Sequence, residues 1–192
     1  MKPLVLFSGG LDSALCLLRA LDVASVHDHV FAAFLDYGQP AVEQEVVAAA
    51  RFLRMLYYLS PLLIGRVRVP GVSLLGSGDG PRIVPGRNLA LYRAVLPSAY
   101  ALGCDRVWYG AIADDAADYE DCRSSWAASV SDPGIPLEAP LASLTKRDVV
   151  RELRKRGVDP RFLWSCYSPS PDGRACGACR SCVALEAAMV EV

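Results

Sequence analysis

The stretch LVLFSGGLDSALCLL, residues 4–18, decides the fold class of this chain. Its apolar start at 4–7 predicts a buried strand, and the apolar spacing over 11–21 predicts a helix. The turn between them, SGGLDS, leaves backbone N–H groups unpaired at the positive end of that helix, where a phosphate group can bind. Adjacent glycines let the backbone approach such an anion closely. The spacing of this turn differs from that of both common nucleotide-binding loops, G-x-x-x-x-G-K-[ST] and G-x-G-x-x-G.

We expect this turn to hold a phosphate or pyrophosphate group. The hydroxyl groups of Ser8 and Ser13 add hydrogen-bond donors, and the carboxylate of Asp12 suits a metal ion or a ribose. An ordinary strand-to-helix turn is the alternative interpretation, which six specified positions between a strand and a helix disfavour. The residues expected around this anion are Phe7, Ser8, Gly9, Gly10, Leu11, Asp12 and Ser13.

The composition excludes several classes of protein. The chain has 192 residues, which suit one domain with a small addition, and 53% hydrophobic with 21% charged residues predict a globular protein. The net charge of −1 offers no basic field, so no nucleic-acid partner is expected. No apolar run reaches the length of a membrane span and no secretory leader is visible, so we expect a cytoplasmic location and no membrane.

Strand and helix signals alternate along the chain. Strands are predicted at 3–7, 30–35, 67–69 and 106–109, and helices at 11–21, 42–56, 88–102, 122–130 and 145–156. This alternation predicts an α/β fold, a doubly wound parallel sheet with helices on both faces. In such sheets ligands bind outside the carboxyl ends of the strands, where segment 36–39 and Gly110 fall.

The remaining segments are predicted to be loops or caps. Residues 70–83 are rich in Gly, Ser and Pro and predict a loop, and the acidic segment 111–121 is predicted to be irregular. Asn88 is placed to cap the helix that follows it. We divide the chain into a nucleotide-binding α/β domain over 1–160 and a C-terminal segment over 161–192.

Four of the seven cysteines crowd near the C-terminus with the spacing C-x9-C-x2-C-x2-C: Cys166, Cys176, Cys179 and Cys182. The odd count and the tight clustering indicate a reducing compartment and a metal site rather than disulfides. Four thiolates complete the tetrahedral shell of zinc without an open position, so a structural zinc ion is expected. An iron–sulfur cluster or a redox pair are the alternatives. Cys16 and Cys104 are expected to pack in the interior.

The SGGLDS turn resembles the PP-loop of the ATP pyrophosphatases, the adenine nucleotide alpha hydrolase-like proteins. Further motifs follow it in order: Asp36-Tyr37-Gly38-Gln39, Val84-Pro85-Gly86-Arg87-Asn88, Tyr119-Glu120-Asp121-Cys122-Arg123, Pro140-Leu141-Ala142-Ser143-Leu144-Thr145-Lys146, and Trp164-Ser165-Cys166-Tyr167 before the other cysteines. Together they resemble the 7-cyano-7-deazaguanine synthase (QueC) family over nearly the whole chain.

The resemblance implies a zinc-containing, ATP-dependent ligase that is a homodimer. Members of this family adenylate the carboxylate of 7-carboxy-7-deazaguanine. Ammonia then displaces AMP to give the amide, and a second activation converts the amide into the nitrile. The partners are therefore a deazaguanine and an amine donor.

The resemblance also implies the site residues. Catalysis is expected to involve Ser8, Asp12, Ser13, Arg87 and Lys146, with nucleotide contacts extended to Asp36, Tyr37, Gly38 and Gln39. The deazaguanine is expected beside Arg87, Asn88, Gly110, Asp115, Tyr119, Asp121, Cys122 and Arg123. The acidic segment 114–121 is suited either to Mg²⁺ or to solvent. For Arg87 and Lys146, purely structural roles at helix starts are the alternative.

The chain also departs from the family pattern. Pro40-Ala41 stand where the family usually has Arg-His, and no arginine follows Cys182 closely. Such changes fit the ordinary reaction or a specialised relative, from an antiphage or nucleoside-antibiotic pathway, that transfers the activated acyl group to another amine such as a protein N-terminus. A PP-loop tRNA sulfurtransferase and a non-catalytic zinc scaffold are further alternatives. Whether Cys122 is reactive stays open at this point.

Overall fold

The computed structural model describes residues 1–25, 29–56, 62–68 and 84–190, with only the backbone described over 62–68. Five parallel strands form one sheet in the order β3-β2-β1-β4-β5. The strands are β1 (Pro3–Leu6), β2 (Val30–Asp36), β3 (Leu62–Arg68), β4 (Arg106–Trp108) and β5 (Leu137–Glu138). All seven residues of β2 are buried, as expected for a strand whose two faces are both covered by helices. The predicted α/β fold with a parallel sheet is confirmed.

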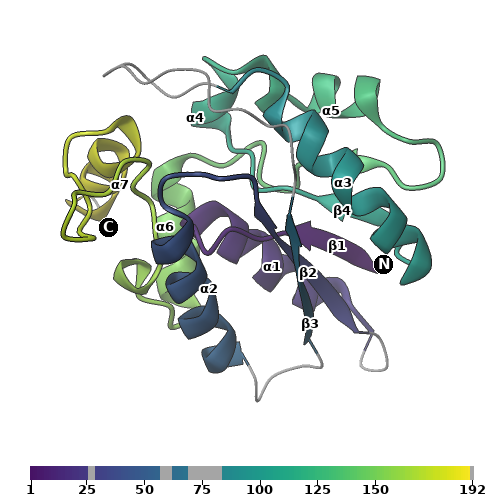
Figure 1. Cartoon of the computed structure of the whole chain (residues 1–192), viewed down its shortest axis with the longest axis horizontal. Coiled ribbons are helices and arrows are strands. Elements are labelled where there is room, and N and C mark those ends of the chain that lie inside the picture. The colour runs from purple at the N-terminus through teal and green to yellow at the C-terminus, as the bar shows by residue number, and fades with distance from the viewer. Residues whose placement is uncertain (26–28, 57–61, 69–83, 191–192) are drawn as a thin grey trace.

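The helices form two layers, one on each face of the sheet (Figure 1). They are α1 (Leu11–Val23), α2 (Val42–Leu56), α3 (Arg87–Ala101), α4 (Ala113–Ala116), α5 (Ser124–Val130), α6 (Lys146–Lys155) and α7 (Arg180–Val190), with 3₁₀ turns at Glu120–Cys122 and Pro160–Phe162. Alternate residues of the strands point to opposite faces. Val5 and Phe34 therefore join a core with α1, α2 and α6, while Leu4 and Phe31 join a second core with α3 and α5.

Several predicted boundaries need correction. The third strand begins at Leu62 and not at 67, and β5, which pairs with β4, lies in the proline-rich connection that carried no strand signal. Asn88 is not the N-cap of α3: Gly86 is, at φ 72°, and Asn88 lies buried in the first turn. The acidic segment 111–121 contains α4 and a 3₁₀ turn. The predicted loop at 70–83 lies outside the described residues.

The helix predicted to begin at Thr145 is confirmed, with a reason visible in its first turn. Thr145 is the N-cap of α6, its hydroxyl accepts a hydrogen bond from the backbone N–H of Asp148, and the Asp148 carboxylate accepts one from the N–H of Thr145. This reciprocal pair satisfies two donors that the helix leaves unpaired. It also fixes the start of α6, and with it the position of Lys146.

The strand order creates a crevice beside the central strand. β1 lies between β2 and β4, so the chain leaves the carboxyl ends of β1 and β4 toward opposite faces of the sheet. Such a switch point is the usual ligand site of a doubly wound sheet. The backbones are close together here, because a Cβ atom at Gly110 would lie 2.8 Å from both Asp12 C and Ser13 N. Gly110 therefore lies beside the first loop, as predicted.

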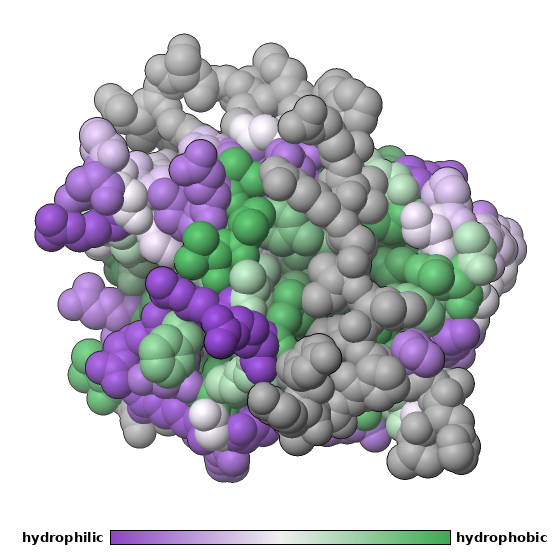
Figure 2. Space-filling model, turned by 60° about the horizontal axis from the view of Figure 1, so that its bottom comes forward, coloured by the Kyte–Doolittle hydropathy of each residue, from purple (hydrophilic) through white to green (hydrophobic). Residues whose placement is uncertain are grey.

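The surface combines polar and apolar residues. Figure 2 shows hydrophobic residues gathered near the middle of one face, with strongly hydrophilic ones along one side of it. Within the described ranges, no helix has both the length and the apolar character needed to cross a membrane.

Tyr92→Phe should destabilise the fold. Tyr92 is fully buried on α3; its hydroxyl donates to Ile135 O at 2.6 Å and accepts from Asp132 N at 2.6 Å, which joins α3 to the connection before β5. Removing the hydroxyl leaves two backbone groups unpaired, at a cost of about 1–3 kcal/mol. Urea unfolding measures the loss. Tyr100→Phe, on the exposed side of the same helix, is the control and should cost less; equal losses would contradict this account.

Candidate active site

The SGGLDS loop is held in shape by its own side chains and by α2. Ser13 Oγ donates to Gly10 O at 3.0 Å and accepts from Ser8 N at 3.2 Å. Gly9 has φ 78°, and a Cβ atom there would lie 2.6 Å from Glu45 O and 2.8 Å from Ala49 N. Only glycine fits this position, since any side chain would push the loop away from α2.

A cavity of about 220 Å³ opens at the carboxyl ends of β1, β2 and β4. Many of the sequence-predicted site residues line it: Phe7, Ser8, Gly10, Leu11, Asp12, Ser13, Tyr37, Gln39, Arg87, Asn88, Gly110, Asp115 and Cys122. These residues come from four separate parts of the chain. The fold thus brings the loop, the end of β2, the start of α3 and the 109–122 region to one place.

Gly9, Asp36 and Gly38 do not line the cavity but shape its wall. The carboxylate of Asp36 accepts a hydrogen bond from Gly38 N at 3.2 Å, which closes the turn that carries Tyr37 and Gln39. Gln39 is buried, and its Nε2 donates to Leu35 O at 3.0 Å while its Oε1 accepts from Tyr37 N at 3.0 Å. The second strand thus ends in a turn whose polar side chains are locked by the backbone.

Lys146 forms an ion pair with Asp12 at the edge of the cavity. Its Nζ lies 2.7 Å from Asp12 Oδ1 and 2.5 Å from Oδ2. Burial by itself would lower the pKa of Lys146, but the Asp12 carboxylate outweighs it and the pKa is raised, so the ammonium stays charged. Lys146 therefore stands beside the first turn of α1 as a cation, where phosphate charge would gather.

Arg87 enters the cavity from the start of α3. Its Nε donates to Asn88 Oδ1 at 3.4 Å, and the phenol groups of Tyr37 and Tyr167 interact electrostatically with its guanidinium. Desolvation opposes its charge, yet these neighbours and Asp121 raise the pKa of Arg87 overall. Arg87 is thus a charged group in the cavity wall, whereas Lys146 acts beside the cavity through its ion pair with Asp12.

The predicted residues of the 115–123 region separate into two groups. Asp115 and Cys122 face the cavity, whereas the carbonyl of Asp121 accepts hydrogen bonds from Asn88 Nδ2 at 3.4 Å and from the Tyr109 hydroxyl at 3.1 Å. Arg123 is exposed, and its Nε donates to Ala116 O at 3.0 Å. The structure does not bring Arg123 to the cavity.

Tyr119 lies against the C-terminal segment. The guanidinium of Arg180 is 5.1 Å from the Tyr119 ring centroid, and Arg180 also pairs with the Asp118 carboxylate and donates to Asp114 O at 3.3 Å. The Asp118 carboxylate thus pairs with Arg180, while the Asp114 carboxylate accepts a hydrogen bond from Lys146 N at 2.7 Å. Among the described residues, only the cysteines bring three or more metal-ligating atoms together, so the acidic segment does not form an Mg²⁺ site by itself.

Cys122 is a buried, neutral thiol. Burial raises its pKa to about 12, and the nearby carboxylates of Asp115 and Asp121 act in the same direction. A reactive thiolate needs the opposite environment, a lowered pKa beside positive charge. Cys122 therefore packs against the site as an uncharged side chain.

Several cavity residues had no site role among the predictions from sequence. Glu45 on α2 also lines the cavity, as do Trp164, Ser165, Tyr167 and Ser181. Trp164 N donates to Gly9 O at 3.0 Å, and the hydroxyls of Ser165 and Ser181 are hydrogen-bonded at 2.7 Å. Trp164, Ser165 and Tyr167 belong to a motif of the resemblance, and Ser181 lies between two of the predicted metal ligands, so the sequence did point to this region. Glu45 had no such signal, because a glutamate in the first turn of a helix is common.

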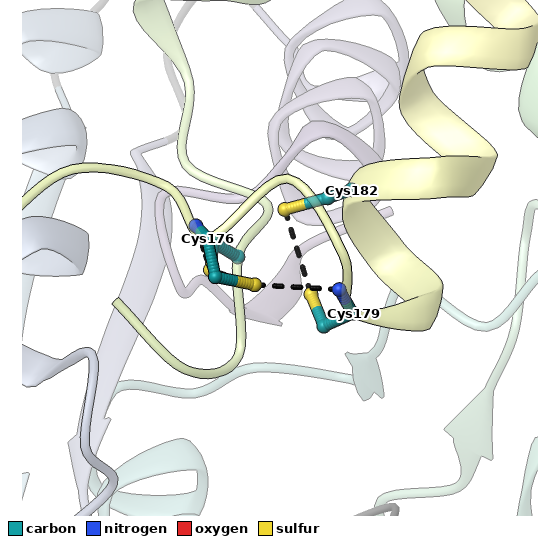
Figure 3. A group of neighbouring side chains, drawn as sticks. Cys176, Cys179 and Cys182 are labelled. Atoms are coloured by element: carbon teal, nitrogen blue, oxygen red, sulfur yellow. Dashed lines mark hydrogen bonds between the residues drawn. The ribbon is translucent and has the colours of Figure 1, made fainter. Parts of the chain in front are cut away.

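The four cysteines predicted as metal ligands lie together. Their sulfur atoms are all within 4.8 Å of one another, with Cys166 Sγ 3.5 Å from Cys176 Sγ and Cys179 Sγ 3.5 Å from Cys182 Sγ. Figure 3 shows the labelled side chains pointing toward one another from a loop and from the first turn of α7. The turn between them passes through Gly177 at φ 71°. Cys16 and Cys104 are buried elsewhere in the cores, as predicted.

This geometry fits a single tetrahedral metal ion. Zinc binds thiolates at about 2.3 Å, which places the sulfurs of one shell about 3.8 Å apart. Backbone N–H groups of Ala178 and Cys179 lower the pKa of Cys176 to about 6, so a thiolate is favoured there. A four-iron cluster attaches each thiolate to a different iron and separates the sulfurs further. The cysteines can therefore hold a metal ion, and their spacing suits one ion better than a cluster.

The sequence matches known proteins along most of its length. Residues 59–192 match the family model described as Queuosine biosynthesis protein QueC. The chain belongs to the QueC family. A 7-cyano-7-deazaguanine synthase of Novosphingobium aromaticivorans is 33% identical over 93% of this chain and 85% of its own length, and one of Stutzerimonas stutzeri is 32% identical over 99% and 94%. One of Myxococcus xanthus is 34% identical over 95% and 90%.

Solved structures share the fold at low sequence identity. The U34-tRNA thiolase NcsA of Methanococcus maripaludis with its [4Fe-4S] cluster has a TM-score of 0.58 at 16% identity, covering 99% of this chain and 65% of its own. A 4-thiouridine synthetase–RNA complex with bound ATP has a TM-score of 0.57 at 18% identity, covering 100% and 50%. At this identity the likeness concerns the PP-loop fold. The QueC family membership implies an ATP-dependent enzyme.

Cys179→Ser should remove the bound metal. The purified wild-type chain is expected to carry close to one metal ion per chain, because four sulfurs converge on one point. Elemental analysis of wild type and variant measures the change. Cys104→Ser, buried away from the cluster, should keep the metal, and retention of metal by Cys179→Ser would contradict the assignment.

Proposed function

We propose that the protein adenylates the carboxylate of 7-carboxy-7-deazaguanine with ATP and couples it to ammonia, giving the amide and then the nitrile. The observation that carries this proposal is the cavity at the sheet's switch point. It joins the SGGLDS loop, one fixed cation at Arg87 and a second at Lys146 beside the loop, and the 109–122 region. The QueC family membership supplies the substrate class.

The residues of the cavity suit adenylation. A carboxylate oxygen of the acid attacks the α-phosphorus of ATP, the new P–O bond forms, and the bond to the β-phosphate oxygen breaks as pyrophosphate leaves. The backbone N–H groups of the loop and the hydroxyl of Ser8 would bind that pyrophosphate, while Ser13, whose hydroxyl donates to Gly10 O, would keep the loop in shape. Arg87, as a planar donor, is suited to hold the carboxylate.

The metals have separate roles in this proposal. The four cysteines would hold zinc, which closes the C-terminal segment and leaves no open position for chemistry. Mg²⁺ would neutralise the phosphates of ATP, with Asp115 as a carboxylate ligand from the cavity wall. Burial raises the pKa of Asp115, although Lys146 opposes the shift.

Sulfur transfer is the weaker alternative despite the shared fold. A sulfurtransferase needs a thiolate that can carry sulfur at the reaction site. Cys122 is the one cysteine among the described lining residues, and its thiol is neutral. The remaining alternative, transfer of the acyl group to a protein amine, proceeds through the same adenylate and differs only in the acceptor.

Product analysis tests the proposal. The purified enzyme, ATP, Mg²⁺, 7-carboxy-7-deazaguanine and ammonium should yield the nitrile together with AMP and pyrophosphate, detected by mass spectrometry. A reaction that stops at the acid adenylate with ammonium but proceeds with a peptide amine would favour the specialised relative. Absence of acid-dependent pyrophosphate release would contradict adenylation altogether.

Lys146→Met should weaken ATP binding. The change removes a cation and leaves Asp12 as an unpaired carboxylate facing the phosphates, so we expect at least a tenfold loss of affinity, about 1.4 kcal/mol. Isothermal titration calorimetry with ATP measures it. Lys155→Met is the matched control at the exposed end of the same helix and should bind ATP normally. Equal affinity in Lys146→Met and wild type would contradict the role given to Lys146.

A further inference from the structure

Glu45 occupies a defined place in the cavity wall. It lies in the first turns of α2, and its backbone carbonyl is the atom that a side chain at Gly9 would strike. Its Oε2 accepts a hydrogen bond from Gln39 Nε2 at 2.8 Å. Gln39 is itself fixed by two hydrogen bonds to the backbone at the end of β2. The carboxylate is therefore held beside the phosphate-binding loop by a rigid partner.

The electrostatic surroundings of Glu45 make it a proton acceptor near neutral pH. Burial raises its pKa to about 7, while the Gln39 amide and the charge of Arg87 oppose the shift. Arg87, from α3, and Tyr37, after β2, are the ionisable groups that act on it most directly, and Asp12, Asp115 and Tyr167 line the same cavity. A base with a pKa near the working pH is the most effective in proton transfer.

The proposed reaction requires such a group. Ammonia exists mostly as ammonium at neutral pH, and ammonium has no free electron pair for attack on an acyl carbon. Lys146 and Arg87 are suited to anions and would repel ammonium, and Asp12 is already paired with Lys146. A carboxylate that attracts the cation and can accept its proton resolves this conflict.

We propose that Glu45 binds the incoming ammonium ion and removes one proton from it, an assignment that rests on the proposed function. The proton passes from nitrogen to a carboxylate oxygen of Glu45, and the electron pair left on nitrogen forms the C–N bond to the acyl carbon. The bond between the acyl carbon and the phosphate oxygen of AMP then breaks, and AMP leaves with the electron pair of that C–O bond. The surplus proton on the new amide nitrogen goes to water, and Glu45 later releases its own proton to solvent.

The test compares Glu45→Gln with Glu43→Gln, which changes an exposed glutamate in the same turn of α2. Acid-dependent exchange of labelled pyrophosphate into ATP reports adenylation alone. Turnover with ammonium reports the amide step, and hydroxylamine replaces ammonium as an amine that is already neutral near pH 7. Thermal melting of both variants reports folding.

We expect Glu45→Gln to keep exchange at the wild-type rate and to lose about 100-fold in kcat/KM for ammonium. With hydroxylamine the loss should shrink to a few-fold. The wild-type kcat/KM for ammonium should rise through an inflection near pH 7 as Glu45 loses its proton, and the variant should lack this inflection. Glu43→Gln should behave as wild type in every assay.

Other results would distinguish a failure of the role given to Glu45 from a failure of the proposed function. Wild-type exchange together with unchanged ammonium turnover in Glu45→Gln would overturn the role of Glu45 and leave the proposed function standing. Loss of exchange in a folded Glu45→Gln would also overturn it, since the residue would then act in ATP binding. Absence of acid-dependent exchange in the wild-type protein would overturn the proposed function and this assignment with it.

Discussion

Close backbone contact around the SGGLDS loop is the constraint on which the rest of the site depends. Gly9 lies against the backbone of α2, and Gly110 lies against the backbone where α1 begins. These contacts bring the ends of β1, β2 and β4 to one point, so that residues distant in sequence line one cavity. Added methyl groups at either glycine would separate the elements, and the cations and carboxylates of the site would move with them.

The C-terminal segment is part of this site as well as a metal centre. Ser165 precedes Cys166 and Ser181 precedes Cys182, and the two serine hydroxyls meet at the cavity wall. A metal ion shared by those cysteines would therefore fix both serines at once. Since a metal site contributes its binding energy to folding, a structural ion here would stabilise one wall of the cavity without touching the reactants.

Much of this could be predicted from sequence because it depends on local patterns. The strand, turn and helix signals of the first 56 residues lie in short stretches of sequence. The spacing of the C-terminal cysteines likewise indicates, without knowledge of the fold, that their thiols can converge on one metal ion. The two-residue strand β5 could not be predicted, since only pairing with β4 makes it a strand. Gly86 caps α3 because it adopts a positive φ. Arg123 points away from the cavity because its side chain donates a hydrogen bond to Ala116 O. Glu45 gains its chemistry from burial, which no local pattern records.

The distribution of charge in the cavity has a chemical logic that joins these observations. Lys146 and Arg87 are cations kept charged by their neighbours, and they suit the two anionic reactants of an adenylation. An amine nucleophile arrives as a cation, so the same field would exclude it unless a carboxylate were nearby. Glu45 lies in that field, close enough to Arg87 to be influenced by it yet hydrogen-bonded to a neutral amide. A full ion pair would have fixed its charge; the amide contact leaves it free to accept and release a proton.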